Sequence, residues 1–167
     1  MPLWVFGYGS LLWNPGFTPA QTVTARLDGY HRSFCMLSVH HRGTEDDPGL
    51  VLALDETEQG RCTGVAFRVA DGEEDAVHAY LRERELISSA YLEADVPLTL
   101  DGGETVTALA YVINRGHVQY CQYPLERQAQ IIARAVGGRG PNTEYLFNTA
   151  QHLAQMGIED TEMAWLV

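Results

Sequence analysis

A glycine-containing loop follows the first apolar segment of the chain. Residues 3–7 predict a short buried strand, and Tyr8, Gly9, Ser10 and Leu11 come directly after it. Because glycine lets the backbone approach a ligand closely, N–H groups in such a loop can bind a carboxylate or stabilise an oxyanion. The loop lacks the GxGxxG spacing and the GK[ST] ending of phosphate-binding loops. An ordinary strand-to-loop turn is the alternative interpretation.

Two glutamates near the end of a predicted helix are candidates for proton transfer. The spacing of apolar residues predicts a helix from Glu73 to about Ile87, with Glu83 and Glu85 in its last turns. Both flank the apolar stripe, so helical phase does not choose between them, and a run of charges is also typical of a solvated face. Glu85 lies where the helix dipole disfavours a negative charge. With partial burial, that position would raise its pKa toward the range useful for proton transfer.

A third segment combines a loop with the start of a helix. Residues 137–141 predict a loop, and Asn142 is a favourable N-cap for the helix that follows. Tyr145 would then lie in the first helical turn, where its hydroxyl could reach a pocket.

The histidines and the loop serine form no familiar catalytic or metal-binding motif. The six histidines show no metal-ligand spacing, although His40 and His41 share a polar loop with Asp46 and Asp47, a weak candidate for a metal. Ser10 lacks the GxSxG context of a nucleophile elbow. We therefore expect neither a metal site nor a Ser–His–Asp triad.

Charge and composition narrow the classes of partner. The 167 residues include 22 acidic and 11 basic side chains, for a formal net charge of −11. Nucleic-acid binding depends on clustered Lys and Arg, so we expect no nucleic-acid partner. An acidic ligand would need local donors, such as backbone N–H groups or a buried arginine, because the overall charge repels it.

Location is predicted from apolar runs and cysteines. No apolar run is long enough to cross a bilayer, so we expect no membrane partner. Cys35, Cys62 and Cys121 are widely spaced, and the N-terminus has no export signal. These features predict reduced thiols in the cytoplasm.

The remaining elements predict a single α+β domain spanning residues 1–167. Tyr8–Pro19 and His40–Gly49 are expected loops. Strands are expected at 3–7, 22–39 with a bend at Gly29, 50–54, 63–69, 92–100 and 104–113, and further helices from Pro124 to Val136 and from Asn142 to about Gly157. The strands cluster on both sides of one helix, without regular β–α alternation. A curved or closed sheet with helices outside it fits this order.

Three segments, taken together, resemble the ChaC family of γ-glutamyl cyclotransferases. They are Val5–Trp13, Tyr80–Glu85 and Asn142–Phe147, and Arg32–Phe34 and His41–Gly43 are similar to the second quarter of the family. The similarity runs through nearly the whole chain in the right order.

The resemblance implies a γ-glutamylcyclotransferase-like fold, with a roughly six-stranded mixed barrel flanked by helices. It implies cleavage of glutathione to 5-oxoproline and cysteinylglycine without metal or cofactor. Tyr8 to Leu11 would hold the γ-glutamyl group together with Tyr145, and Glu85 would be the catalytic acid/base. Two alternatives are a cyclotransferase for another γ-glutamyl amine or amino acid, and a non-catalytic γ-glutamyl-binding module. The sequence leaves the oligomeric state open.

Overall fold

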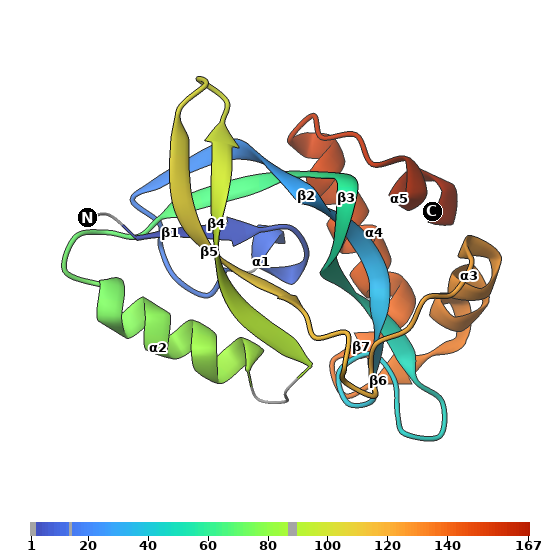
Figure 1. The fold of residues 1–167 in the computed structure, drawn as a ribbon. Coiled ribbons are helices and arrows are strands. Elements are labelled where there is room, and N and C mark those ends of the chain that lie inside the picture. Colours follow the sequence, from blue (N-terminus) through green and yellow to red (C-terminus); the bar gives the residue numbers. More distant parts are fainter. Residues whose placement is uncertain (1–2, 14, 87–89) are drawn as a thin grey trace.

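Five strands close into a barrel in the order β1-β3-β2-β4-β5 (Figure 1). The structure is a computed structural model and describes residues 3–13, 15–86 and 90–167. The strands are β1 Trp4–Gly7, β2 Gln21–Ser38, β3 Gly49–Arg68, β4 Tyr91–Leu100 and β5 Thr105–Ile113. Short β1 lies between β3, with which it pairs antiparallel, and β5, with which it pairs parallel. The sheet is therefore mixed, as predicted.

The barrel has five strands instead of six because β3 is continuous. The sequence predicted strands at 50–54 and 63–69 with a turn through Gly60 between them, and this is wrong. Strand β2 pairs with β3 from Gln21↔Arg68 to Ser38↔Gly49. The register shifts between Asp28 and Tyr30, so the expected turn residues are accommodated as an irregularity within β3. Gly29 has φ +90° at this shift, which confirms the predicted bend of β2.

The predicted hairpin of β4 and β5 is confirmed. Its strands pair antiparallel from Tyr91↔Ile113 to Thr99↔Thr105. The turn closes with a hydrogen bond from the Gly103 N–H to the Leu100 carbonyl (2.8 Å), and Gly103 adopts φ +91°. A side chain would disfavour that conformation.

The helices lie outside the barrel (Figure 1). They are α1 Ser10–Trp13, α2 Glu74–Glu85, α3 Leu125–Arg134, α4 Asn142–Gln155 and α5 Thr161–Leu166. The sequence missed α1, which lies inside the expected Tyr8–Pro19 loop, and α5. Helix α3 ends before the expected Val136, because Val136–Gly137 (β6) and Gly140–Pro141 (β7) pair as a small ribbon. The end expected at about Ile87 for the helix that begins near Glu73 falls outside the described residues.

Asn142 does not cap α4. The residue before the helix is Pro141, and Asn142 is the first helical residue. The buried Asn142 side chain accepts a hydrogen bond from the Leu50 N–H and donates one to the Leu50 carbonyl, both at 2.8 Å. It therefore fixes the start of α4 against β3, which explains a buried amide here.

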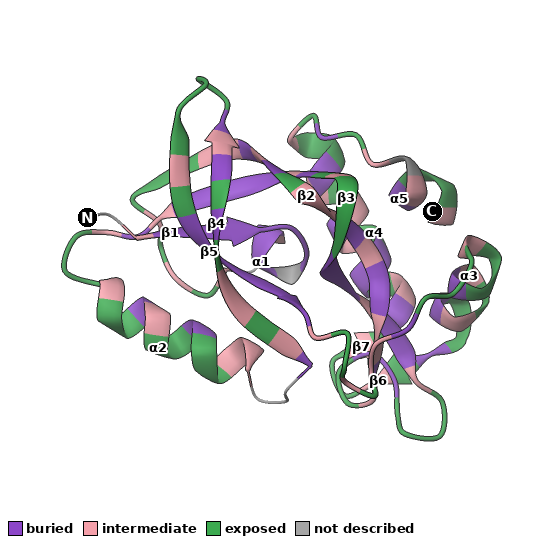
Figure 2. Cartoon of the chain, in the orientation of Figure 1, coloured by how far each residue is buried: buried purple, intermediate pink, exposed green. Residues whose placement is uncertain are grey.

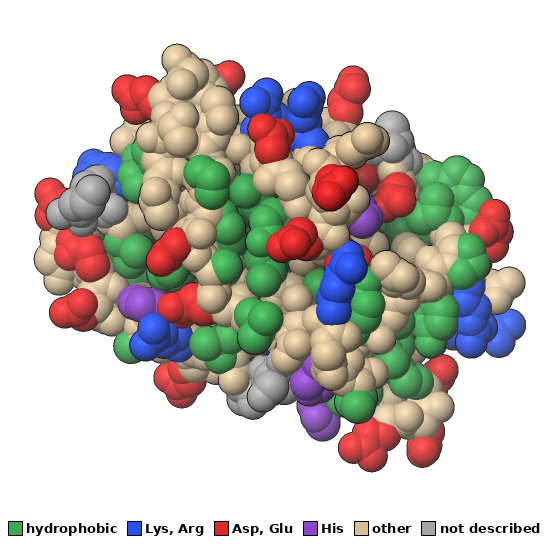
Figure 3. Space-filling view, viewed as in Figure 1, with side chains coloured by type: hydrophobic (Ala, Val, Ile, Leu, Met, Phe, Trp, Pro, Cys, Tyr) green, Lys and Arg blue, Asp and Glu red, His purple; other side chains and the backbone are tan. Residues whose placement is uncertain are grey.

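The core fills the barrel, and the outer faces of the helices carry exposed residues (Figure 2). Fully buried core side chains include Phe6, Leu27, Leu54 and Leu98. The three cysteines are free, as predicted, and they are buried; burial raises the pKa of the Cys62 and Cys121 thiols to about 11. Acidic side chains are scattered over the face in Figure 3. Among the described residues, no helix is both long and apolar enough to cross a membrane.

Candidate active site

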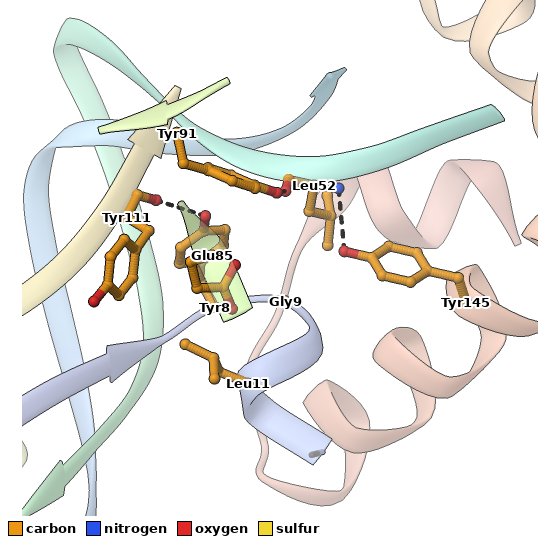
Figure 4. A pocket seen from close by; sticks show the side chains of 8 residues that line it. All are labelled: Tyr8, Gly9, Leu11, Leu52, Glu85, Tyr91, Tyr111 and Tyr145. Carbon is orange, nitrogen blue, oxygen red and sulfur yellow. Dashed lines mark hydrogen bonds between the residues drawn. The ribbon is translucent and has the colours of Figure 1, made fainter. Parts of the chain in front are cut away.

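A pocket of about 280 Å³ forms where one end of the barrel meets the ends of α2 and α4 (Figure 4). The lining residues come from distant parts of the chain. They are Tyr8, Gly9, Leu11, Leu52, Glu85, Tyr91, Tyr111 and Tyr145. The structure thus brings together Tyr8, Gly9, Leu11, Glu85 and Tyr145 of the predicted site. Ser10 is the first residue of α1, and its side chain lies outside the part that the structure describes.

The loop after β1 passes directly beneath the Tyr145 hydroxyl. A Cβ atom at Gly9 would lie 3.2 Å from the Tyr145 oxygen and 3.5 Å from the Leu52 Cβ. The Leu12 N–H donates to the Gly9 carbonyl (2.9 Å), which turns the chain into α1. A larger residue at position 9 would therefore occupy space that the loop shares with the pocket.

Arg32 fixes the loop that follows β1 by a hydrogen bond to its backbone. Its Nε donates to the Tyr8 carbonyl (2.7 Å), and its guanidinium pairs with Asp160 (Nη1–Oδ2 2.9 Å). Its Nη2 also donates to the Thr63 carbonyl, and because the Arg32 side chain is only 3% exposed, its charge is balanced almost entirely by these three partners. Arg32 does not line the pocket, and its contribution is to fix the Tyr8 carbonyl. Sequence analysis missed this contact, since only the fold brings residues 8, 32 and 160 together.

Glu85 is the last residue of α2, and its side chain points toward the tyrosines (Figure 4). The Glu85 side chain is 13% exposed, and its Oε1 lies 3.3 Å from the Arg84 Nε. Burial raises the Glu85 pKa, while the charges of Arg84 and Arg139 act in the opposite direction. Glu83, which helical phase could not distinguish from Glu85, is exposed and does not line the pocket.

Three tyrosine hydroxyls in the pocket have fixed hydrogen-bond roles. Tyr8 donates to the Tyr111 carbonyl (2.7 Å), and Tyr91 donates to the Leu52 carbonyl (2.9 Å). The Leu52 N–H donates instead to the Tyr145 oxygen, at 3.2 Å. Tyr8 and Tyr91, whose hydroxyls also lie within hydrogen-bonding reach of each other, can therefore act toward a ligand only as acceptors, whereas Tyr145 keeps its proton available as a donor. Burial raises the pKa of all three phenols, so they remain neutral at physiological pH.

Tyr91 and Tyr111 were not predicted as site residues. Tyr91 is the first residue of β4, and Tyr111 lies within the apolar run of β5. An aromatic residue in such a run is typical of a barrel core, and no motif marks either one. Tyr111 presents its carbonyl to Tyr8, while its hydroxyl donates to Glu93 (3.1 Å).

A larger pocket of about 1020 Å³ adjoins the first, and Glu85, Tyr91 and Tyr145 line both. His40 and His41 lie in its lining, so the polar loop that the sequence marked as a weak candidate for a metal site borders the larger pocket. Within residues 3–13, 15–86 and 90–167, no group of three or more His, Cys, Asp or Glu residues is arranged to hold a metal ion.

The family model described as "ChaC-like protein" matches residues 3–167. The chain belongs to this family. A glutathione-specific γ-glutamylcyclotransferase of Escherichia coli K12 is 39% identical over 160 residues, covering 95% of this chain and 68% of that protein. The γ-glutamylcyclotransferase 2-3 of Arabidopsis thaliana is 35% identical over 167 residues, covering 96% of this chain and 84% of that protein.

The barrel is also similar to a solved member of this enzyme class. A crystal structure of a glutathione-specific γ-glutamyl cyclotransferase from yeast superposes with a TM-score of 0.88, covering 99% of this chain and 93% of that one, at 23% identity. At that identity the likeness concerns the fold. It confirms the predicted α+β barrel of the γ-glutamylcyclotransferase type.

Proposed function

We propose that this chain is a glutathione-specific γ-glutamylcyclotransferase, which converts glutathione to 5-oxoproline and cysteinylglycine. The observation that carries the proposal is the buried Glu85 carboxylate among tyrosine hydroxyls, in a pocket lined by the glycine loop. The pocket is small and is lined by tyrosines and the glycine loop, which suits one small acyl group. Family membership and the activities named for the relatives support the same reaction.

Glu85 carries the proton in this reaction. The α-ammonium of the γ-glutamyl group, with a reference pKa of about 8, must lose a proton before its nitrogen can attack. The Glu85 carboxylate accepts that proton and later delivers it to the departing cysteinyl nitrogen. A carboxyl pKa raised by burial suits both steps, because Glu85 must be a stronger base than an ordinary glutamate and still return the proton.

Ring closure needs neither a nucleophile of the protein nor water. The α-nitrogen forms a bond to the γ-carbonyl carbon, and the bond from that carbon to the cysteinyl nitrogen breaks. All atoms of glutathione are then found in 5-oxoproline and cysteinylglycine. Because the attack is intramolecular, the protein contributes mainly by holding the chain folded in the reactive geometry.

The tyrosines divide the binding of the γ-glutamyl group between them. Tyr8 and Tyr91 have lone pairs free for the ammonium, since their protons are already donated to carbonyls. Tyr145 has a proton free for the oxyanion, on the same side as the backbone of Gly9. One such donor is worth about 3–4 kcal/mol in a comparable site. These neutral donors suit a chain of net charge −11 that binds an acidic peptide.

The three free thiols support a reducing compartment, and we place the enzyme in the cytoplasm.

The proposal is tested with glutathione as sole substrate, by quantifying 5-oxoproline and cysteinylglycine. We expect the two products in equal amounts. A panel containing γ-glutamylalanine and γ-glutamyl-ε-lysine separates the alternatives. Inert glutathione with turnover of a panel member would assign another γ-glutamyl substrate. Binding of glutathione by calorimetry with no turnover of any member would assign a binding module.

A further inference from the structure

The larger pocket is cationic in a strongly acidic protein. The described residues that line it include Arg42, Arg84, Arg139, His40 and His41, and their one carboxylate is Glu85. The whole chain has twice as many acidic as basic side chains, 22 against 11. A local reversal of charge of this kind is a feature that attracts an anion.

Two of the three arginines already have anionic or acceptor partners. Arg42 donates to the Pro141 carbonyl and to Glu144, both at 3.1 Å. Arg84 pairs with Glu85 and donates to the Tyr80 hydroxyl (3.3 Å). Their charges are therefore used in part within the protein.

Arg139 differs from both. Its guanidinium has no hydrogen bond or ion pair to any residue that the structure describes, and the residue is exposed. Its backbone is nevertheless fixed, because the Arg139 N–H donates to the His41 carbonyl (2.9 Å) and the Gly138 N–H to the His40 carbonyl (2.7 Å). A Cβ at Gly137 would clash with the Gly43 backbone nitrogen, so the β6–β7 ribbon packs tightly on this loop. A rigid turn thus presents a free guanidinium to the pocket.

His41 is a weaker candidate than Arg139 for binding an anion in the larger pocket. Burial, followed by the charges of Arg139, His40 and Arg42, lowers the His41 pKa below its usual value. His41 is therefore neutral at pH 7, and the available fixed charge is that of Arg139.

The larger pocket adjoins the position at which the leaving peptide would depart. Glu85, which would protonate the cysteinyl nitrogen, lines both pockets, so the leaving dipeptide extends from the small pocket into the cationic one. Two extended residues span about 7 Å, which places the glycine carboxylate well beyond Glu85. The larger pocket has ample volume for a dipeptide.

We infer that Arg139 binds the terminal carboxylate of the leaving peptide, and that the enzyme thereby selects γ-glutamyl peptides with a free C-terminus. The inference rests on the proposed function and adds a specificity-determining residue to it. The guanidinium contacts the substrate at the end remote from the reacting atoms, in the ground state and in the transition state alike. Measured at a pH above the acid limb of Glu85, its loss therefore raises KM and leaves kcat nearly unchanged.

The test compares glutathione with glutathione amidated at its glycine carboxylate. For the wild type we expect a KM about 10- to 100-fold higher for the amide, in keeping with a lost charge-assisted hydrogen bond. Arg139→Gln should raise the KM for glutathione by a similar factor and leave that for the amide unchanged. Arg139→Lys should keep part of the preference, and Arg134→Gln, which removes an exposed arginine from α3, should keep all of it.

The outcomes distinguish a failure of the role inferred for Arg139 from a failure of the proposed cyclotransferase activity. Wild-type turnover with equal kinetics for acid and amide overturns the role of Arg139 and leaves the cyclotransferase intact. The same holds if Arg139→Gln changes both substrates equally. Absence of 5-oxoproline from glutathione in the wild type overturns the proposed function, and this inference with it.

Discussion

The Glu85 carboxylate lies between the tyrosines at one end of the barrel and the guanidinium groups of Arg84 and Arg139. Burial favours its neutral form, and Arg84 and Arg139 favour its charged form. The net effect is a raised Glu85 pKa. This reduces the difference between the pKa of the carboxyl and that of the substrate α-ammonium, so proton transfer between them costs less free energy. Glu83, two residues earlier on α2, has neither the burial nor the access to the pocket.

Glu85→Gln is expected to lower kcat by about 10²- to 10⁴-fold, the usual contribution of a general acid/base. The amide keeps the size of the side chain but cannot accept the proton. Glu83→Gln removes an exposed carboxylate from the same helix and should leave kcat unchanged. Release of 5-oxoproline gives the rates, and thermal melts confirm that both variants fold. Full activity of Glu85→Gln would contradict the role given to this residue.

The dependence of kcat/KM on pH should reveal the raised pKa of the Glu85 carboxyl. Because only the carboxylate accepts a proton, kcat/KM should fall as pH is lowered through the Glu85 pKa. That apparent pKa should lie above 4.5, the ordinary value for glutamate. Arg139→Gln removes a charge that lowers this pKa, so its acid limb should move to still higher pH. An acid limb at or below 4.5 in the wild type would be incompatible with a buried catalytic carboxylate.

Tyr145→Phe tests the donor proposed for the oxyanion. The change leaves the ring in place and removes the proton, so we expect kcat to fall about 10²-fold. It also leaves the Leu52 N–H without its acceptor, at a cost of about 1–3 kcal/mol in the free energy of unfolding. Tyr120→Phe is the matched control, since it removes a hydroxyl bonded to Asp55 outside both pockets. Equal kcat values for the two variants would exclude Tyr145 as a donor to the reacting group.

At the scale of elements, the site is assembled from their ends. Glu85 ends α2, Tyr91 begins β4, Tyr8 follows β1, and Tyr145 lies in the first turn of α4. Only the closed barrel brings these ends together, because the strand order β1-β3-β2-β4-β5 is not the chain order. The position of each end therefore depends on the pairing of strands elsewhere.

This arrangement explains which parts of the site could be predicted from the sequence. The glycine loop, Glu85 and Tyr145 lie in segments with a local signal, namely a strand end, a charged helix end and a helix start. Tyr91 and Tyr111 have no such signal, because an aromatic residue in an apolar strand serves a core equally well. Tertiary contacts decided between these two uses.

The errors in the fold have a common physical origin. Acidic residues and Gly60 suggested a turn between two strands, but a long partner strand can accommodate extra residues as a register shift. Asn142 satisfied the N-cap rule, yet the Leu50 backbone of β3 competed for its side chain and formed both hydrogen bonds. In each case a long-range partner outweighed a local preference.

Glu93 links α2 to the barrel and gives a prediction at this scale. It accepts hydrogen bonds from Arg82 of α2 and from the Tyr111 hydroxyl of β5, and His78 lies 2.9 Å from its Oε1. Arg82, the largest cause, and the other donors lower the Glu93 pKa to about 2. A carboxyl with a depressed pKa stabilises the fold above its unfolded pKa of about 4.5, and this stabilisation is lost as pH falls toward about 2.

Glu93→Gln should therefore lower the free energy of unfolding by about 1 kcal/mol at pH 7, the scale of charge-assisted hydrogen bonds at a partly exposed site. Urea titrations between pH 7 and pH 3 give the comparison. The gap between wild type and variant should narrow below pH 4.5, because the wild type alone loses the stabilisation of this carboxylate. A gap that stays constant with pH would show that the charge of Glu93 does not contribute.

At the scale of the whole molecule, the buried pair of Arg32 and Asp160 connects the last part of the chain to the first. Asp160 precedes α5, and its Oδ1 caps that helix by accepting the Met163 N–H (3.0 Å). Its Oδ2 pairs with Arg32, which in turn holds the Tyr8 carbonyl at the pocket. The packing of α5 and the geometry of the glycine loop are therefore linked through one guanidinium.

Asp160→Asn separates the charge of this residue from its capping role, because the amide oxygen can still accept the Met163 N–H. It leaves Arg32 buried without a counter-charge, so we expect a loss of about 3 kcal/mol in the free energy of unfolding. At temperatures where the variant remains folded, kcat should also fall, since the Tyr8 carbonyl loses a firmly held partner.

Asp28→Asn is the control: Asp28 pairs with Arg26 and Arg61, but its side chain is 60% exposed. That change should cost less than about 1 kcal/mol and leave kcat unaltered. Denaturant unfolding and the 5-oxoproline assay measure the two effects, and equal losses for both variants would refute a special contribution of the buried pair.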